Sequence, residues 1–282
     1  MAFKDVLLVI STYPDPTPVG AIDEAVDIAA ALGARISAIA CELKFKVPGN
    51  IFGKVLVDVP AMAATEAGKS ARNAEALLAA FQESAEKRGI FQDGVLERCL
   101  TTEAPDLLVE YSRLRDLTIV PVAEEPGSVA WQAEAIIFGS GRPVMVIPEV
   151  RKRARAFSLD TVVVAWDFSR PAARAVGDAL SILERAKRVH VVTVTNEKII
   201  DTRRSGHELA KLLARHGVNV VLDTVDAAGR DIGTTLESYV AMQNADLLVM
   251  GAYGHSRLRD FVLGGATRSM IRKPPVPIFL SH

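Results

Sequence analysis

The hydrophobic positions of the chain form short, nearly continuous apolar runs that alternate with segments of helical spacing. In the second half, strands are expected at 161–166, 189–194, 218–225, 246–251 and 276–281. Runs this short and rich in β-branched residues are typical of buried strands. Their alternation with helices predicts an α/β fold, in which a parallel sheet has helices on both faces.

Helices are expected between these strands, because apolar side chains recur there every three or four residues. Their predicted inner faces are Ala172, Val176, Ala179, Leu180 and Leu183; then Leu209, Leu212 and Leu213; and then Ile232, Leu236, Tyr239 and Val240. The second half therefore has the pattern of one complete five-stranded unit.

The first half repeats this order of elements. Segments 5–11, 35–41, 116–122 and 143–147 correspond to 161–167, 188–194, 246–252 and 277–281. The first half has an insertion near 45–63, and a long helix is expected after it, with Ala74, Leu77, Leu78, Phe81 and Ala85 on one face. We therefore predict a tandem duplication, with a degenerate domain at 1–150, a second domain at 151–282 and a solvated basic linker near their junction.

Composition and charge narrow the class of protein. The chain is 49% hydrophobic and 24% charged, with a net charge of -1, which argues against a surface built for nucleic acid or anionic lipid. The first apolar run, VLLVI, is too short to span a membrane. Cys41 and Cys99 lie in apolar runs and are expected as buried, reduced thiols. We expect a cytoplasmic protein without a nucleic-acid or membrane partner.

Residues 249–270, VMGAYGHSRLRDFVLGGATRSM, contain four glycines between an expected strand and an expected helix. Glycines and a helix N-terminus allow backbone N–H groups to converge on a phosphate. In an open α/β sheet, such a ligand lies beyond the carboxyl ends of the strands. Neither GxxxxGK[ST] nor a GxGxxG after a first strand is present. From spacing alone, a phosphate cradle and a simple turn both remain open.

The spacing Gly251-x-x-Gly254, nine residues, then Gly264 resembles the nucleotide signature of the universal stress protein family. The resemblance covers essentially the whole chain, as two copies of a five-stranded unit. It implies two Rossmann-like units of the adenine nucleotide alpha hydrolase type. These units would pair through their fifth strands as an intramolecular pseudo-dimer. Whether two such chains also form a homodimer stays open. It also implies that the C-terminal domain binds ATP, ADP or AMP, with or without Mg, in a regulatory or protective stress-response factor.

The resemblance also implies the site residues. Asp167, at the end of the first strand of the second unit, would lie by the ribose and phosphates, and the backbone of Val194 would meet the adenine. The expected nucleotide-binding set is Ala165, Asp167, Val194, Met250, Gly251, Gly254, Gly264, Gly265, Ala266 and Thr267. Asp167 could also cap the helix that begins near Ser169 or Pro171.

One residue departs from the family pattern. Gly265 stands where the family has Ser or Thr, so a hydroxyl is missing, and Thr267 or Ser269 could replace it only if the helix start shifts. The backbone amides remain. Binding can therefore persist with a weaker grip on the terminal phosphate, which keeps AMP and ADP open beside ATP.

The first unit lacks this signature. Ser11 stands in the place of Asp167, Cys41 stands in the place of Val194, and PVAEEPG (121–127) replaces the glycine loop. Pro121 removes an amide donor, and the two following glutamates would repel phosphate. Gly139 and Gly141 come too late in the unit and are expected to form a helix end and a turn. The first unit is not expected to bind a nucleotide through this motif.

Other chemistry has little support in the sequence. The five histidines have no metal-ligand spacing, and no GxSxG elbow or evident general base is present. No catalytic or metal site is therefore predicted, and the protein is at most a slow ATPase in which Asp167 places a metal ion. A scaffold that does not bind nucleotides, with relic glycines, is the alternative from a different class.

Overall fold

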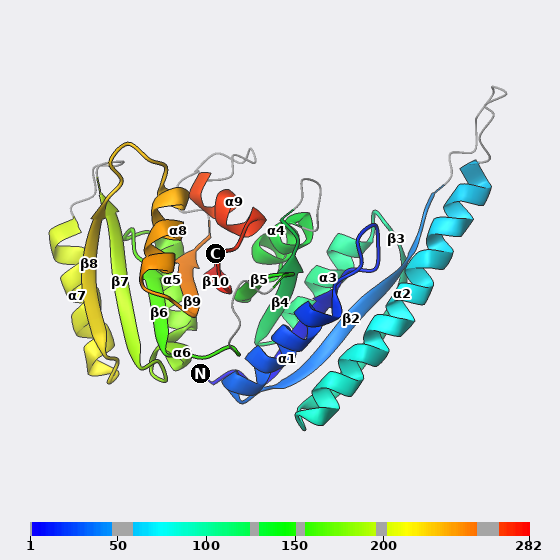
Figure 1. Ribbon diagram of the computed structural model, residues 1–282, viewed down its shortest axis with the longest axis horizontal. Coiled ribbons are helices and arrows are strands. Elements are labelled where there is room, and N and C mark those ends of the chain that lie inside the picture. Colours follow the sequence, from blue (N-terminus) through cyan, green and yellow to red (C-terminus); the bar gives the residue numbers. More distant parts are fainter. Residues whose placement is uncertain (1, 47–58, 125–129, 151–155, 196–201, 253–264) are drawn as a thin grey trace.

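Ten strands form one continuous sheet across the molecule (Figure 1). The computed structural model describes residues 2–46, 59–124, 130–150, 156–195, 202–252 and 265–282. The strand order is β3-β2-β1-β4-β5-β10-β9-β6-β7-β8. Within each half the strands are parallel, and the first strand of the half lies between its second and its fourth.

Nine of the strands described here occur where the apolar runs predict them, whereas the third strand of the first half, an edge strand with mostly exposed or half-buried side chains, was not predicted. Those of the first half are β1 (Asp5–Ile10), β2 (Arg35–Lys44), β3 (Phe91–Leu100), β4 (Leu117–Val122) and β5 (Val144–Pro148). Those of the second half are β6 (Thr161–Ala165), β7 (Arg188–Thr195), β8 (Val220–Asp226), β9 (Leu247–Gly251) and β10 (Ile278–Ser281). The predicted fold class, two five-stranded parallel units, is confirmed.

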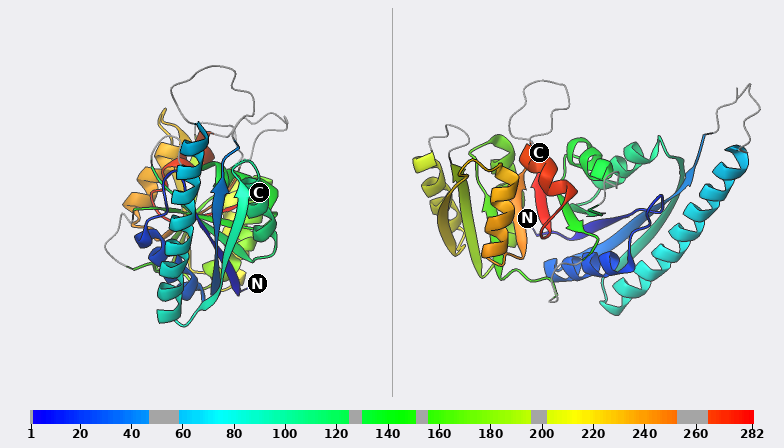
Figure 2. Two further views of the ribbon diagram at one scale, coloured as in Figure 1. Left: turned by 90° about the vertical axis from the view of Figure 1, so that its right-hand side faces the viewer. Right: turned by 45° about the horizontal axis from the view of Figure 1, so that its top comes forward.

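Helices cover both faces of the sheet (Figure 2). The first half contains α1 (Val19–Leu32), α2 (Val59–Lys87), α3 (Ala104–Arg113) and α4 (Ala130–Gly139), and the second contains α5 (Arg170–Asp178), α6 (Leu180–Leu183), α7 (Thr202–Arg215), α8 (Ile232–Met242) and α9 (Gly265–Arg272). One buried cluster joins the sheet to α1, α2, α5, α6 and α7, and the other joins it to α3, α4, α8 and α9. Side chains of β1 alternate between the two clusters, which is why its sequence is apolar throughout.

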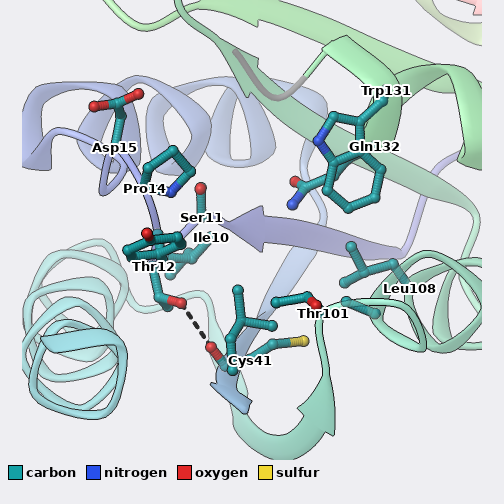
Figure 3. A pocket seen from close by; sticks show the side chains of 13 residues that line it. Ile10, Ser11, Thr12, Pro14, Asp15, Cys41, Thr101, Leu108, Trp131 and Gln132 are labelled. Carbon is teal, nitrogen blue, oxygen red and sulfur yellow. Dashed lines mark hydrogen bonds between the residues drawn. The ribbon is translucent and has the colours of Figure 1, made fainter. Parts of the chain in front are cut away.

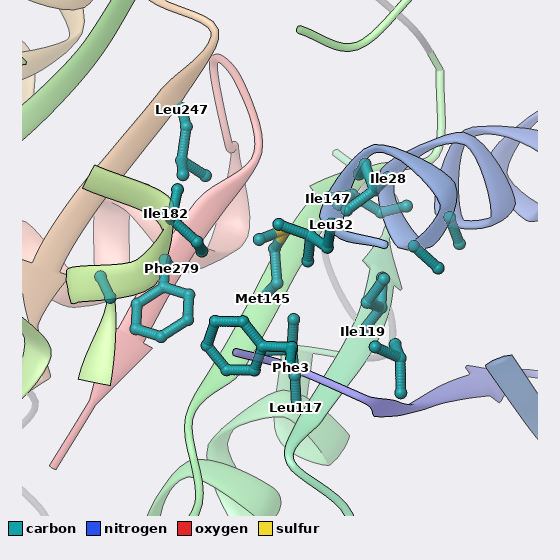
Figure 4. Packing of buried hydrophobic residues seen from close by; sticks show 14 of the residues in the cluster. Phe3, Ile28, Leu32, Leu117, Ile119, Met145, Ile147, Ile182, Leu247 and Phe279 are labelled. Carbon is teal, nitrogen blue, oxygen red and sulfur yellow. The ribbon is translucent and has the colours of Figure 1, made fainter. Parts of the chain in front are cut away.

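The two halves meet where β5 pairs with β10. This pair is antiparallel, with Met145 opposite Phe279 and Val146 opposite Ile278. The ring of Phe279 packs edge-on against that of Phe3 at 5.9 Å between centroids, and both rings belong to the same buried cluster as Met145 (Figure 4). Nη1 of Arg185 donates to the carbonyl of Leu32 at 3.0 Å. The expected pairing through the fifth strands is confirmed, and the halves share one core.

The helices in the structure differ from the predicted ones in two details. The helix α2 begins at Val59, so the last residues of the apparent insertion are helical, and residues 47–58 lie outside the described part of the chain. Its predicted face is buried, except that Leu78 is only partly buried. Leu212 is 46% exposed, whereas Leu209 and Leu213 are buried, because one side chain of an adjacent pair must turn away from the sheet.

A polar cluster lies between β7, β8 and α8. Nδ1 of His190 lies 2.9 Å from Oδ2 of Asp223, and the Tyr239 hydroxyl donates to the same carboxylate oxygen. Burial alone would raise the pKa of Asp223, but the hydrogen bonds from Tyr239 and His190 leave that pKa below its usual value. Burial and the bond to Asp223 raise the pKa of Tyr239. The cluster joins the edge of the sheet to α8.

Tyr239→Phe is expected to lower the free energy of unfolding by about 1–3 kcal/mol at pH 7, the usual cost of losing a hydrogen bond to a charged group. The depressed pKa of Asp223 means that this stabilisation is present above about pH 3.9, the unfolded value. It is lost as the pH falls through the folded pKa. Urea unfolding of wild type and variant at pH 7 and at pH 3 measures the difference.

Tyr111→Phe is the matched control, since that hydroxyl donates to Glu97 at a half-buried position of the other half. It should cost under about 1 kcal/mol. An effect of Tyr239→Phe that is the same at both pH values would contradict the role of the carboxylate.

Candidate functional site

The order of the strands creates a switch point in the second half. The chain passes from β6 to β7 on one side, and later returns to place β9 on the other side. Ligands of open α/β sheets bind in the crevice beyond the carboxyl ends of strands at such a point. Ala165 ends β6 and lies opposite Met250 of β9 and Val192 of β7.

Three predicted site residues share one face of the sheet at this edge. Ala165 and Val194 are half-buried, Met250 is buried, and all three pack with the cluster that includes α8 and α9. They therefore form an apolar wall across the ends of β7, β6 and β9. Such a wall with a few polar groups at its margin is typical of small-molecule sites.

Asp167 lies in the turn that follows β6. Its Oδ1 accepts from the backbone N–H of Ser169 at 3.0 Å, and Oγ of Ser169 accepts from Ala172 N–H at 3.2 Å. The N-cap of α5 is therefore Ser169, and the interpretation of Asp167 as the cap is wrong. Phe168 lies between Asp167 and Ser169 in the sequence and is 67% exposed. Its φ of 60° is an uncommon backbone conformation for a bulky residue. The turn holds Asp167 in a defined place beside the wall.

Gly251 has a packing role that the sequence pattern did not indicate. A Cβ atom at this position would lie 2.4 Å from the backbone N of Ala172 and 2.5 Å from the carbonyl C of Pro171. The first turn of α5 therefore lies directly against the end of β9. Gly251 is required for this contact whether or not a phosphate binds nearby.

The last predicted residues lie at the start of α9. Gly265 begins this helix, and within the described part of the chain a Cβ there would meet nothing within 4 Å. Thr267 is buried, and Ser269 faces Gly233 in the first turn of α8, where a Cβ on Gly233 would lie 3.1 Å from Ser269 Oγ. The contact with Gly233 places α9 at the carboxyl edge of the sheet. Gly254, Gly264 and the side chain of Ala266 lie outside the described residues.

The first half has a different arrangement at the equivalent edge. Ser11 follows β1 directly, and Cys41 lies on β2. Burial raises the pKa of Cys41 and of Cys99, so both free cysteines are buried thiols, as predicted. Gly139 ends α4, and Gly141 has φ of 67° in the turn before β5. The interpretation of these two glycines as a helix end and turn is confirmed.

The residues that the structure describes contain neither a metal-binding cluster nor a membrane-spanning helix. Among them, no group of three or more His, Cys, Asp or Glu side chains is placed to hold a metal ion. No helix in the described ranges has the length and apolar character needed to cross a membrane.

Comparison with known proteins gives matches to universal stress proteins. The model of the universal stress protein family matches residues 158–282. The universal stress protein Slr1230 of Synechocystis is 30% identical over 158 residues, which cover 54% of this chain and 51% of the relative. The matched region thus spans about half the length of that relative.

Two solved structures are similar over nearly the full length. A universal stress protein of Archaeoglobus fulgidus has a TM-score of 0.69 at 18% identity, with 98% of this chain and 95% of the other covered. A putative universal stress protein of Pseudomonas aeruginosa has a TM-score of 0.60 at 14% identity, with 99% and 93% covered. These matches show that the tandem two-unit fold occurs in both proteins.

Proposed function

We propose that the C-terminal unit, in which residues 158–282 match the model of the universal stress protein family, binds an adenine nucleotide. The observation that carries the proposal is the convergence of Ala165, Val194 and Met250 on one face at the switch point between β6 and β9. An apolar wall at this place suits the flat face of adenine. In the cell the protein acts as a cytoplasmic regulatory or protective factor in the stress response.

Each polar feature has a proposed part in binding. Asp167 lies by the ribose and phosphates, and its carboxylate would meet any Mg²⁺ that accompanies them. The backbone amides of the loop with Gly254 and Gly264, and of the helix start at Gly265 to Thr267, hold the phosphates, as a helix N-terminus favours anions. We propose a site that binds its ligand rather than turning it over, and among the described residues we assign no general base.

Isothermal titration of the full chain with ATP, ADP and AMP tests the proposal. Binding of at least one nucleotide is expected, and Gly254→Val should remove it through steric bulk in the loop. Absence of heat with all three at millimolar concentration would overturn the proposed function. An unchanged affinity in Gly254→Val would place the site elsewhere.

Gly265→Ser is expected to increase the affinity for ATP about tenfold, or ~1.4 kcal/mol, by restoring a hydroxyl that can donate to phosphate. A Cβ at this position meets no described residue within 4 Å, so the described part of the site has room for the serine side chain. Gly265→Ala is the matched control, because it adds a Cβ without a donor and should leave the affinity within about twofold. Equal gains in the two variants would show that helix stability, and not the hydroxyl, is responsible.

A further inference from the structure

The first half contains a cavity of about 210 Å³ at the carboxyl ends of β1 and β2 (Figure 3). Apolar side chains from the strands and from α3 line one part of it, including Ile10, Leu43 and Leu108. Trp131 and Gln132, in the first turn of α4, line another part. Small-molecule sites usually occupy about 300–1,000 Å³, so this cavity suits a molecule smaller than a nucleotide.

Two buried oxygen atoms at this cavity have no hydrogen-bond partner. Oγ of Ser11 and Oε1 of Gln132 are both unpaired within the described residues, although these residues are only 3% and 8% exposed. The amide of Gln132 points toward Ser11 across the end of β1 (Figure 3). The neighbouring Thr12 hydroxyl, in contrast, donates to the Cys41 carbonyl at 2.6 Å. Unpaired buried oxygens are rare and costly, so two of them at one cavity indicate that a bound molecule supplies the missing hydrogen-bond donors.

The charge around the cavity is negative. Among the described residues, its lining includes the carboxylate of Asp15 and no Lys, Arg or His. Burial, together with the charge of Asp15, raises the pKa of Glu149 to about 7, so a second carboxylate lies within electrostatic reach of the first. This field repels phosphate and carboxylate ligands, and it attracts cations.

We propose that the cavity binds a small organic ammonium ion, a primary amine carried on an apolar or aromatic body. Gln132 Oε1 and Ser11 Oγ are closed to solvent, so these side chains must rotate toward the cavity to accept from the ammonium group, which Asp15 attracts. The apolar lining takes the body of the ligand, and Trp131, which is 44% exposed at the mouth, offers an aromatic face. The first half is then a second ligand-binding unit with the opposite charge preference from the nucleotide site.

Three probes of one shape and different charge test the proposal: benzylamine, benzyl alcohol and benzoate, titrated into the full chain at pH 7 and followed by ¹H–¹⁵N NMR. Benzylamine is expected to bind at least tenfold more tightly than benzyl alcohol, with shifts at Ser11, Gln132 and the end of β1. Benzoate should cause no shifts there. Tighter binding of benzyl alcohol or benzoate, or no binding of benzylamine at millimolar concentration, would overturn the proposal.

Gln132→Met keeps the side-chain volume and removes the unpaired acceptor. It should weaken benzylamine binding about tenfold, while the melting temperature without ligand stays equal or rises, since a buried unpaired oxygen is gone. Gln82→Met, on the exposed surface of α2 where Gln82 bonds Glu86, should leave the affinity unchanged. Unchanged benzylamine affinity in Gln132→Met would refute the assigned site.

A further variant separates this site from the nucleotide site. Gly254→Val should leave benzylamine binding intact, whether or not the second half binds nucleotides. Loss of benzylamine binding in a folded Gly254→Val protein would contradict a cavity in the first half.

Discussion

Gly251→Ala is expected to lower the free energy of unfolding by ~3 kcal/mol or more, the upper range for overpacked positions. The added Cβ would lie 2.4 Å from the backbone N of Ala172 and 2.5 Å from the carbonyl C of Pro171. Neither is the end of a flexible side chain, so α5 or the end of β9 must move. The turn that holds Asp167 precedes α5, and nucleotide affinity should fall together with stability. Guanidinium unfolding and titration with the best-binding nucleotide measure the two effects.

Gly265→Ala is the control for this prediction. It makes the same chemical change at a position where a Cβ meets none of the described residues within 4 Å. Because Gly265 is the first residue of α9, alanine there should be neutral or stabilise by up to about 1 kcal/mol. Similar losses in both variants would mean that the contact between α5 and β9 is not the cause.

Phe279→Ala is expected to lower the free energy of unfolding by about 3–5 kcal/mol, the usual cost of removing a buried phenyl ring. Phe279 is fully buried, and it packs against Phe3 of the other half and lies opposite Met145 across the β5–β10 pair. Because one core spans both halves, wild type should unfold in a single transition. The variant should lose part of this cooperativity. Denaturant curves followed by both circular dichroism and tryptophan fluorescence report on this.

Phe168→Ala makes the same change at a site that is 67% exposed, and should cost under about 1 kcal/mol. Two separate transitions in wild type, or an effect of Phe279→Ala no larger than that of Phe168→Ala, would contradict a shared core.

Most strands could be predicted from the sequence because both faces of the sheet are covered, whereas β3, an edge strand with few buried side chains, could not. Consecutive side chains of β1 enter opposite buried clusters, so the segment is apolar without interruption and stands out from its surroundings. Helical faces are harder to assign, as Leu212 shows, because two adjacent leucines cannot both face the sheet. The pairing of β5 with β10 was not visible in any periodicity. It was expected only through the family resemblance.

The candidate sites likewise contain some features that could be predicted from the sequence and others that could not. Ala165, Val194 and Met250 were predicted through the resemblance, and the structure brings them to one face. The packing role of Gly251 depends on Pro171 and Ala172, which are distant in the chain and carry no mark of that contact. Likewise, the unpaired oxygens of Ser11 and Gln132 are recognisable only when β1 and α4 are seen together. The pattern of a single sequence gives periodicity and spacing. It does not show which buried polar atoms lack a hydrogen-bond partner once the chain has packed.

The pairing of β5 with β10 also affects how the sequences of the two halves can diverge in evolution. Met145 and Phe279 occupy equivalent positions of the two copies, and they lie opposite each other at the centre of the antiparallel pair. In a dimer of identical subunits, a residue on the twofold axis must fit a copy of itself. Within one chain that requirement is lifted, and a large ring can complement a flexible thioether. Covalent linkage also fixes the ratio of the two units at one to one. Every molecule therefore carries one copy of each pocket, and a mutation in one pocket leaves the other unchanged. Duplication followed by fusion thus permits a division of labour between halves that still share a core.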